Sequence, residues 1–339
     1  MAQTPAEIRK LCTRFLSGHK PWSVKDRLAS MAASPWAEYD PDIYGEGELI
    51  NSLEHEVAEL LGKESGLFVM KGIIAQLSAL RAWTNRSGVH TVALHPWSHI
   101  DLDESHAYER LHPLQGLRTG DYEPFRAADL DALAERVGVV VVELPLRRSG
   151  FRLPPWDDLV AISEWCRERN VPLHFDGARL WECTAFYGRS YAEICSLADS
   201  VYVSFYKGVG GLAGCVLAGA ADFIKEANAW KGRHGGNIFT AFPYVLTAKQ
   251  GLQEHVPKMA SYCARARDIA AALSAIPGLH IAPDPPHTNA FQVYFPARPK
   301  PLEQAHLEIA ESERVWLFGG FWPTPLPNIS MSEVQLGSG

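Results

Sequence analysis

The run VGVVVVELPL, residues 137–146, constrains the fold of this chain more than any other segment. Its residues are apolar all round and mostly β-branched, which is typical of a β-strand that is covered on both faces. Strands of that kind belong to parallel sheets with helices on either side. After Pro154-Pro155, the segment WDDLVAISEWCRER has its apolar residues at helical spacing, so a helix is expected to follow the strand.

The same alternation of strand and helix extends over the first two thirds of the chain. A helix is expected over residues 52–62, where Leu53, Val57, Leu60 and Leu61 share one face and Gly62 ends the helix. Another is expected from Gly72 to about Trp83. Further strands are expected at 67–70, 89–95, 171–175, 199–205 and 214–219. This order predicts an α/β fold with a mostly parallel sheet.

The pattern changes at about Pro243. One long helical stretch is expected over residues 243–273, followed by short strand-like pieces, LHIAP and AFQVYF, and many prolines. We interpret this part as a smaller α+β lobe. The expected domains are an N-terminal segment, 1–40, that packs with the small domain, a large α/β domain, 41–250, and a small C-terminal domain, 251–339.

Composition excludes several classes of protein. The net charge of −7 argues against a nucleic-acid partner or an anionic membrane surface. The six cysteines are scattered without a C-x-x-C pair, which fits neither a disulfide framework nor a zinc site, so no metal and a cytoplasmic location are expected. The N-terminus, MAQTPAEIRKLCTRFL, carries charges where a signal peptide has its apolar run, and VGVVVVELPL is too short to span a bilayer.

The first chemical motif is HFDGAR, which follows the expected strand VPLHF. In an open α/β sheet, ligands bind beyond the carboxyl ends of the strands, where Asp176 would lie. A carboxylate there can hold a proton on a heterocyclic nitrogen, and Arg179 offers the two-pronged donor geometry that a substrate carboxylate accepts. The alternative is a structural Asp–Arg pair at a strand-to-loop corner.

The second motif is SFYKGVGG, in which Lys207 leaves another β-branched strand and precedes glycines. A desolvated lysine has a lowered pKa and can form a Schiff base, and glycines let a cofactor approach the backbone. Ser204 could offer a hydroxyl to a phosphate. Taken alone, the motif also fits a glycine-rich turn with a lysine that extends to solvent. Lys207 together with Asp176 predicts a site for pyridoxal 5′-phosphate (PLP).

These motifs resemble those of the threonine aldolase family of fold-type I PLP enzymes. HFDGARLW is similar to the family's His-x-Asp-Gly-Ala-Arg motif, SFYKGVGGLAGCVLAG to its lysine segment, HPWSHIDLDESH to its His-Ile-x-x-x-Glu stretch and DPDIYGEG to its Asp-x-Tyr-Gly-Glu segment. The resemblance covers roughly residues 40 to 250 well and the rest loosely. It implies a mostly parallel, seven-stranded sheet between helices and a smaller α+β C-terminal domain.

The resemblance also implies roles for single residues. Lys207 would bind the cofactor covalently, Asp176 would contact its ring nitrogen, and Arg179 would bind the substrate carboxylate. His99 would stack on the cofactor ring, although by itself it would be interpreted as an ordinary polar loop residue. Tyr44 would lie near the site of a neighbouring subunit, so a homodimer or homotetramer is expected.

The chain departs from the family at the phosphate end of the site. Where the family has Ser-Gly-Thr, this chain has Lys71-Gly72-Ile73, which removes both hydroxyls. Gly72 can still present a backbone N–H at the start of a helix, and Lys71 adds a positive charge.

Further departures concern arginines and the N-terminus. In RHGGNIF, Ile238 replaces the family's arginine, and Arg233 or His234 is the candidate to compensate. The C-terminal NISMSEVQL has no counterpart of the family's second carboxylate-binding arginine. LSGHKP, with Ser17 and His19, takes the place of an N-terminal Ser-Asp-Thr, and both are candidates for substrate binding.

The leading hypothesis is a retro-aldol lyase that cleaves a β-hydroxy-α-amino acid into glycine, or a relative of glycine, and an aldehyde. His99, directly or through a water, is the candidate base for the β-hydroxyl proton. One alternative is another PLP reaction on the same scaffold, such as β-elimination, racemisation or a transaldolase-like transfer. A second alternative, motivated by the missing arginines, is a PLP-binding protein without catalytic activity.

Overall fold

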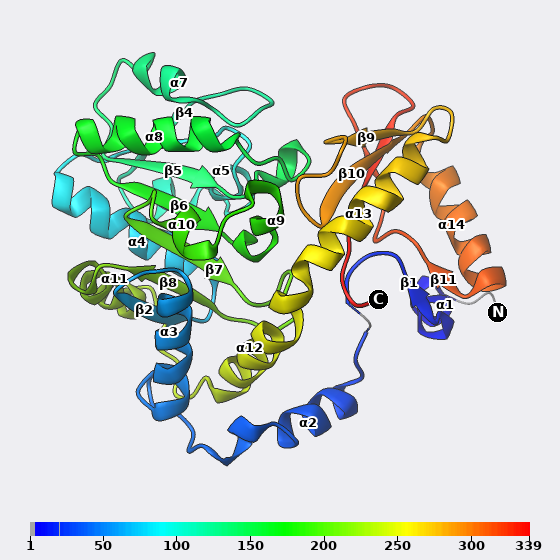
Figure 1. Cartoon of the computed structure of the whole chain (residues 1–339), viewed down its shortest axis with the longest axis horizontal. Coiled ribbons are helices and arrows are strands. Elements are labelled where there is room, and N and C mark those ends of the chain that lie inside the picture. Colours follow the sequence, from blue (N-terminus) through cyan, green and yellow to red (C-terminus); the bar gives the residue numbers. More distant parts are fainter. Residues whose placement is uncertain (1–3, 20) are drawn as a thin grey trace. The chain divides into compact units, whose positions relative to one another are not determined.

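The computed structural model describes residues 4–19 and 21–339. The chain forms two compact units (Figure 1). The large unit is Lys25–Pro257, and the small unit combines Met1–Val24 with Lys258–Gly339. The unit boundaries lie near, but not at, the domain boundaries expected after residues 40 and 250, and the functional assignment of the domains stays a prediction.

The large unit contains a seven-stranded sheet in which only β8 runs antiparallel to its neighbours. The prediction of a mostly parallel sheet is therefore confirmed. β5 lies inside the sheet and its four valines are at most 4 % exposed, as the unbroken apolar run predicts. In spatial order the strands are β2 (Ser65–Val69), β8 (Cys215–Gly219), β7 (Ser200–Ser204), β6 (Leu173–Gly177), β5 (Val139–Glu143), β3 (Thr91–Leu94) and β4 (Gln115–Arg118).

Helices surround this sheet (Figure 1). The helices expected near residues 52–62, 72–83 and 156–169 are present as α3 (Glu48–Leu60), α4 (Gly72–Ser87) and α8 (Trp156–Glu168). The others of this part of the chain are α2 (Val24–Ala32), α5 (His99–Leu102), α6 (Ala107–Arg110), α7 (Ala127–Asp131), α9 (Thr184–Tyr187), α10 (Tyr191–Cys195), α11 (Ala221–Arg233) and α12 (Phe242–His255). Short 3₁₀ turns are η1 (Pro35–Glu38), η2 (Arg147–Ser149), η3 (Leu180–Glu182) and η4 (Val256–Lys258).

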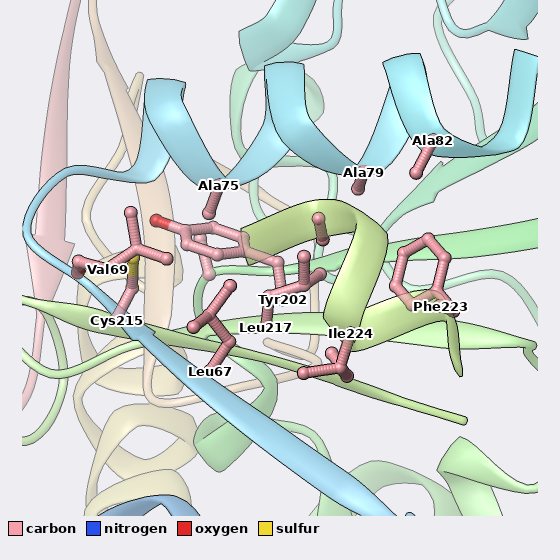
Figure 2. Close-up of a cluster of buried hydrophobic side chains, with 12 residues drawn as sticks. Leu67, Val69, Ala75, Ala79, Ala82, Tyr202, Cys215, Leu217, Phe223 and Ile224 are labelled. Atoms are coloured by element: carbon pink, nitrogen blue, oxygen red, sulfur yellow. The ribbon is translucent and has the colours of Figure 1, made fainter. Parts of the chain in front are cut away.

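A buried apolar cluster joins α4 and α11 to the sheet (Figure 2). Ala75, Ala79 and Ala82 line one side of α4, and their small side chains let the helix lie close to β2, β8 and β7. Phe223 of α11 is fully buried and stacks on Trp83 of α4, with the ring centroids 4.3 Å apart. This packing fixes the position of α4, whose first residues reach the site described below.

The small unit has a four-stranded antiparallel sheet and a two-stranded parallel pair. In spatial order the larger sheet is β12 (Trp322–Pro323), β13 (Ser330–Gln335), β10 (Ala290–Phe295) and β9 (His280–Ala282), and the pair is β1 (Arg14–Phe15) with β11 (Val315–Trp316). Its helices are α1 (Pro5–Leu11), α13 (Met259–Ser274) and α14 (Pro299–Glu313).

One expectation for this part of the chain was wrong, and one helix was not predicted. The helical stretch 243–273 is not continuous, because η4 separates α12 from α13 at Pro257, which has no N–H to donate within a helix. The small unit also contains a helix that the sequence did not predict, α14, in a region rich in prolines. Pro299 and Pro301 lie in the first turn of α14, where a missing N–H costs nothing. Among the described residues, no helix is both long and apolar enough to cross a membrane.

Candidate functional site

The candidate site lies at the carboxyl ends of β5, β6 and β7 in the large unit. Glu143 ends β5, Asp176 lies opposite it in β6, and Tyr202 lies opposite Asp176 in β7. Lys207 follows β7 by three residues. A cavity of about 190 Å³ is lined here by Lys71, Gly72, Ile73, Gln76, His99, Asp103, Glu104, Asp176, Ala178, Tyr202, Tyr206 and Lys207. The motifs HFDGAR and SFYKG, and the stretch that contains His99, therefore contribute to one cavity.

Asp176 is only 2 % exposed, and burial raises its pKa. The nearby charges of Lys207 and His99 act in the opposite direction, as does the backbone N–H of Ala178, which donates to Oδ1 at 3.2 Å. Burial and the charge of Asp176 together raise the pKa of Glu143 to about 7. The neighbouring carboxyl groups of Asp176 and Glu143 do not both ionise easily, because their negative charges repel. A cationic ring N–H bound at Asp176 would favour the ionised form of Asp176.

His99 begins α5 and is held by two carboxylates. Its backbone N–H donates to Oε2 of Glu143 at 2.7 Å, and its Nδ1 lies 3.1 Å from Oε1 of Glu104. Burial disfavours the charged imidazole, but the hydrogen bond to Glu104 and the charge of Asp176 outweigh this effect and raise the pKa of His99. A donor at Nδ1 leaves Nε2 as the proton acceptor of the neutral ring.

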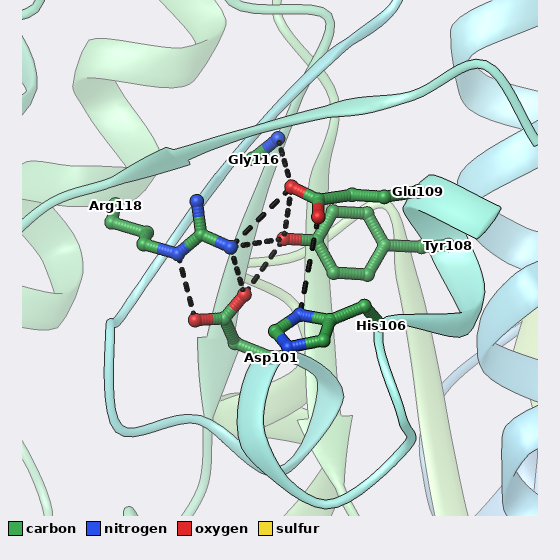
Figure 3. A network of polar contacts seen from close by, with 6 residues as sticks. All are labelled: Asp101, His106, Tyr108, Glu109, Gly116 and Arg118. Atoms are coloured by element: carbon green, nitrogen blue, oxygen red, sulfur yellow. Dashed lines mark hydrogen bonds and ion pairs between the residues drawn. The ribbon is translucent and has the colours of Figure 1, made fainter.

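A second polar network fixes the segment that carries His99 (Figure 3). Arg118 of β4 donates two hydrogen bonds to the carboxylate of Asp101 in α5, each 2.8 Å long, and the hydroxyl of Tyr108 donates a third at 2.8 Å. Asp101 is 3 % exposed. Although Arg118 is partly exposed, paired bonds from a guanidinium to a buried carboxylate are stronger than single surface ion pairs, so they hold α5 against β4.

Lys207 lies in a poorly solvated environment that contains both arginines and carboxylates. Burial, followed by the positive charge of Arg179, lowers the pKa of its amine. A lowered pKa makes more of the amine available as a nucleophile, as a Schiff-base lysine requires. The glycine that follows also makes room for a buried carboxylate, because a Cβ on Gly208 would lie 2.6 Å from Oε1 of Glu182.

Arg179 is held on two sides. Its Nη1 donates to Oε1 of the fully buried Glu182 at 3.2 Å, and its guanidinium carbon lies 5.2 Å from the ring centre of Phe151. Its Nε is buried and has no hydrogen-bond partner among the described residues. The structural Asp–Arg pair considered above is not formed, because the carboxylate that pairs with Arg179 is Glu182.

The N-terminus of α4 contributes Lys71, Gly72 and Ile73 to the cavity. Lys71 is the N-cap and gives no side-chain hydrogen bond to the first turn, so the helix dipole and N–H groups are available to an anion. Gly72 is required for a different reason, since a Cβ there would lie 2.3 Å from the hydroxyl of Tyr202. An amine, a buried carboxylate, an imidazole and an uncapped helix start around one cavity fit the aldehyde, ring and phosphate of PLP.

Other predicted residues lie outside this cavity lining, and their roles stay predictions. The hydroxyl of Ser204 donates its one proton to the carbonyl of Ala178 at 2.7 Å. Tyr44 is 61 % exposed and forms an edge contact with Phe239, and exposed Arg233 stacks on Trp230 at 4.3 Å. Ser17 and His19 belong to the small unit, where they bond Gln335 and Ser338.

The sequence did not predict several polar residues of the site: Gln76, Glu104, Glu143, Glu182 and Tyr206. A signal existed for two of them. Glu104 is the last residue of HPWSHIDLDE and lies five positions after His99. Glu143 is the first charged residue after the four valines. A charge that directly follows a buried strand lies at the sheet edge where ligands bind.

Comparisons with known proteins agree with this geometry. The beta-eliminating lyase family model matches residues 28–297. The "low specificity L-threonine aldolase" of Escherichia coli O157:H7 is 30 % identical over 245 residues, which cover 68 % of this chain and 70 % of that one. The "probable low-specificity L-threonine aldolase 2" of Arabidopsis thaliana is 28 % identical over 88 % of this chain and 85 % of its own length.

A solved structure is similar over nearly the whole chain. The crystal structure of a "putative L-allo-threonine aldolase" from Listeria monocytogenes EGD-E superposes with a TM-score of 0.93 and 36 % identity, covering 97 % of this chain and 92 % of that one. The expectation of fold type I is thereby confirmed. The chain belongs to the beta-eliminating lyase family and, within it, to the threonine aldolases, which are PLP-dependent lyases of fold type I.

Proposed function

We propose that this protein cleaves the Cα–Cβ bond of a β-hydroxy-α-amino acid of the threonine type, releasing glycine and an aldehyde. The observation that carries the proposal is that Lys207, Asp176 and His99 line one cavity. An amine nucleophile, a buried carboxylate and an imidazole base are the side chains that a retro-aldol reaction on PLP needs.

The chain's own residues would hold the cofactor at three points. Lys207 would bind its aldehyde carbon, Asp176 its protonated ring nitrogen, and the N-terminus of α4 its phosphate. Lys71 adds a positive charge at that end of the cavity in place of the family's hydroxyls. When bound, PLP supplies an electron sink for the pair of electrons released from the breaking Cα–Cβ bond.

Arg179 would bind the substrate's α-carboxylate. Glu182 and Phe151 restrain its guanidinium, and its Nε still needs an acceptor. A carboxylate oxygen is a suitable partner, because charge-assisted bonds to a guanidinium are strong and directional. The same restraint would orient the α-carbon of the substrate toward Lys207.

His99 would remove the β-hydroxyl proton as the aldehyde carbonyl forms. Its Nδ1 is bonded to Glu104, so Nε2 is the basic atom, and Glu104 stabilises the imidazolium that results. The same imidazolium, or a water bonded to it, can return a proton to the α-carbon, which completes glycine. The proton removed from the β-hydroxyl is thus balanced by the proton added to the α-carbon, so glycine and the aldehyde are released without net gain or loss of protons.

The assembly state and location also belong to the proposal. Ile43, Tyr44 and Phe239 are each more than half exposed, and such a group of apolar side chains suits a contact with a second copy in a homodimer or homotetramer. All six cysteines are buried free thiols, which supports a reducing cytoplasm.

A direct test is to supply L-threonine and L-allo-threonine to the PLP-loaded enzyme and to measure acetaldehyde and glycine. Stoichiometric release of both products supports the proposal. Release of ammonia and 2-oxobutyrate would instead indicate β-elimination, and exchange of the α-proton without cleavage would indicate racemisation. A cofactor absorbance that no amino acid changes would indicate a binding protein without catalytic activity.

A further inference from the structure

A chain of hydrogen bonds leads through the core of the large unit to the candidate site. Nε1 of Trp83 donates to Oγ of Ser200 at 2.8 Å, the same Oγ lies 2.8 Å from Nδ1 of His174, and Nε2 of His174 lies 2.7 Å from Oε1 of Gln76. Ser200 and His174 are fully buried, and Gln76 is 1 % exposed. We call these four residues the Gln76 relay.

The direction of each bond follows from the chemistry of its members. The indole of Trp83 can only donate, so the hydroxyl proton of Ser200 is available to Nδ1 of His174. Burial lowers the pKa of His174 to about 3, so the ring is neutral and carries its one proton on Nε2. That proton goes to Oε1 of Gln76, which turns the amide nitrogen of Gln76 away from His174.

The amide nitrogen of Gln76 is buried and forms no hydrogen bond of ordinary length with a described residue. It nevertheless acts on the carboxylate of Asp176, which lines the same cavity as Gln76 and Lys207. A buried donor without a full hydrogen bond is costly, so a small movement of this amide toward an acceptor in the cavity is favoured. The nearest chemical match is the carboxylate of Asp176, whose ionised form the Gln76 amide favours.

We propose that Gln76 is a positioning residue of the cofactor site: its amide nitrogen donates to the Asp176 carboxylate in the loaded enzyme, and Trp83, Ser200 and His174 hold it in that orientation. The proposal rests on the proposed function only in that PLP places its ring nitrogen at Asp176. Its consequence is that Asp176 stays ionised and able to hold the ring proton.

The need for such a donor follows from the surroundings of Asp176. Burial favours the neutral carboxyl of Asp176, and Glu143, opposite in β5, adds a like charge when it is ionised. A neutral Asp176 could not stabilise a protonated ring nitrogen. Besides the charges of Lys207 and His99, the backbone N–H of Ala178 and the amide of Gln76 are the groups that favour the anion.

The test compares two cofactors in the apoprotein: PLP and its 1-deaza analogue, which has carbon in place of the ring nitrogen. Dissociation constants are measured from the quenching of tryptophan fluorescence, without any substrate. Gln76→Met keeps the side-chain volume and removes the donor. It should lower the preference for PLP over the deaza analogue about tenfold or more, the size expected for one hydrogen bond to a charged group.

Two further variants make the result decisive. Gln250→Met is the matched control, because Gln250 is a partly buried glutamine of α12, and it should leave the preference unchanged. If Gln76→Met does not fold, Gln76→Asn replaces it, since the shorter amide cannot reach both His174 and Asp176. It should lose the preference likewise.

The outcomes separate this proposal from the proposed function. A purely structural role for Gln76 would weaken the binding of both cofactors equally and leave their ratio unchanged, which would overturn the proposal. Failure of the wild-type protein to distinguish the two cofactors would also overturn it. A lowered ratio would support it even if no amino acid were cleaved, because the measurement needs only cofactor binding.

Discussion

Arg179 donates to the buried carboxylate of Glu182, with Nη1 3.2 Å from Oε1. The bond occupies one nitrogen of the guanidinium and leaves Nε without a partner among the described residues. The pair also lies beside Lys207, whose pKa the charge of Arg179 lowers. Arg179 is therefore expected to bind the substrate carboxylate, and its charge also lowers the pKa of the Lys207 amine.

Replacing Arg179 is expected to weaken substrate binding without loss of the bound cofactor. Charge-assisted hydrogen bonds are worth about 1.5–3 kcal/mol, so Arg179→Ala should raise KM by about tenfold to a hundredfold. Arg179→Lys should restore little, because an ammonium cannot form the two-pronged contact. Steady-state kinetics and cofactor absorbance are the measurements. Normal KM in Arg179→Ala would show that Arg179 is structural and direct attention to Ser17, His19 and Arg233.

The same variant removes the guanidinium that forms an ion pair with the buried Glu182. Breaking a buried ion pair by removing one partner costs about 3–5 kcal/mol, so urea unfolding of Arg179→Ala should show a loss of stability. Adding Glu182→Gln should recover much of that stability while KM stays high. If the double variant recovered both the stability and the normal KM, the effect of Arg179→Ala on KM would have come from misfolding.

Lys207 is expected to be the covalent attachment point of the cofactor. Reduction of the PLP-loaded enzyme with borohydride, followed by peptide mass mapping, should find the pyridoxyl group on Lys207. Lys71 lines the same cavity, and Lys231 is a second buried lysine with a lowered pKa, so both are internal controls. A label on either one would contradict the assignment.

The pH dependence of activity should report the contact between His99 and Glu104. A base must be neutral, and Glu104 raises the pKa of His99, so kcat/KM should fall as pH decreases through a value above that of an ordinary imidazole. Glu104→Gln keeps a hydrogen-bond acceptor and removes the charge, which should shift this acidic limb to lower pH. Glu135→Gln, at an exposed and distant carboxylate, is the control. An unchanged limb in Glu104→Gln would exclude His99 as the group observed.

The packing of α11 on α4 should contribute strongly to stability. Phe223 is fully buried and stacks on Trp83, so Phe223→Ala should lower the free energy of unfolding by about 3–5 kcal/mol. Leu326→Ala, at a side chain that is 65 % exposed, should change it by less than about 0.5 kcal/mol. Urea titration of the apoprotein measures both. Equal effects would show that the cluster in Figure 2 is not a major part of the core.

The protein is expected to be a dimer or a tetramer of its 37.5 kDa chain. Light scattering in the presence of PLP should give twice or four times that mass. Phe239→Asp would place a charge in the exposed apolar group with Ile43 and Tyr44, and it should shift the protein toward smaller species. A monomeric mass for the wild-type protein would contradict the expectation.

Much of the fold followed from the sequence because its signals are local. The four valines of β5 predict a strand buried on both faces, and the alternation of strands with helices predicts a parallel sheet. The motifs HFDGAR and SFYKG could be identified because ligand-binding residues follow strand ends directly. The sequence did not predict α14, whose prolines lie in its first turn, where a helix tolerates them.

The sequence alone determined the residue types and their order, namely a lysine and an aspartate at the ends of two strands, together with the motifs that resemble a family. Only the tertiary structure decided which side chains meet. Glu182 with Arg179, Glu104 with His99 and Gln76 with His174 are contacts made by packing and by turns, whose partners no periodicity specifies. The physical reason is that strand pairing and burial bring distant residues together, as in the 98 positions that separate Gln76 from His174.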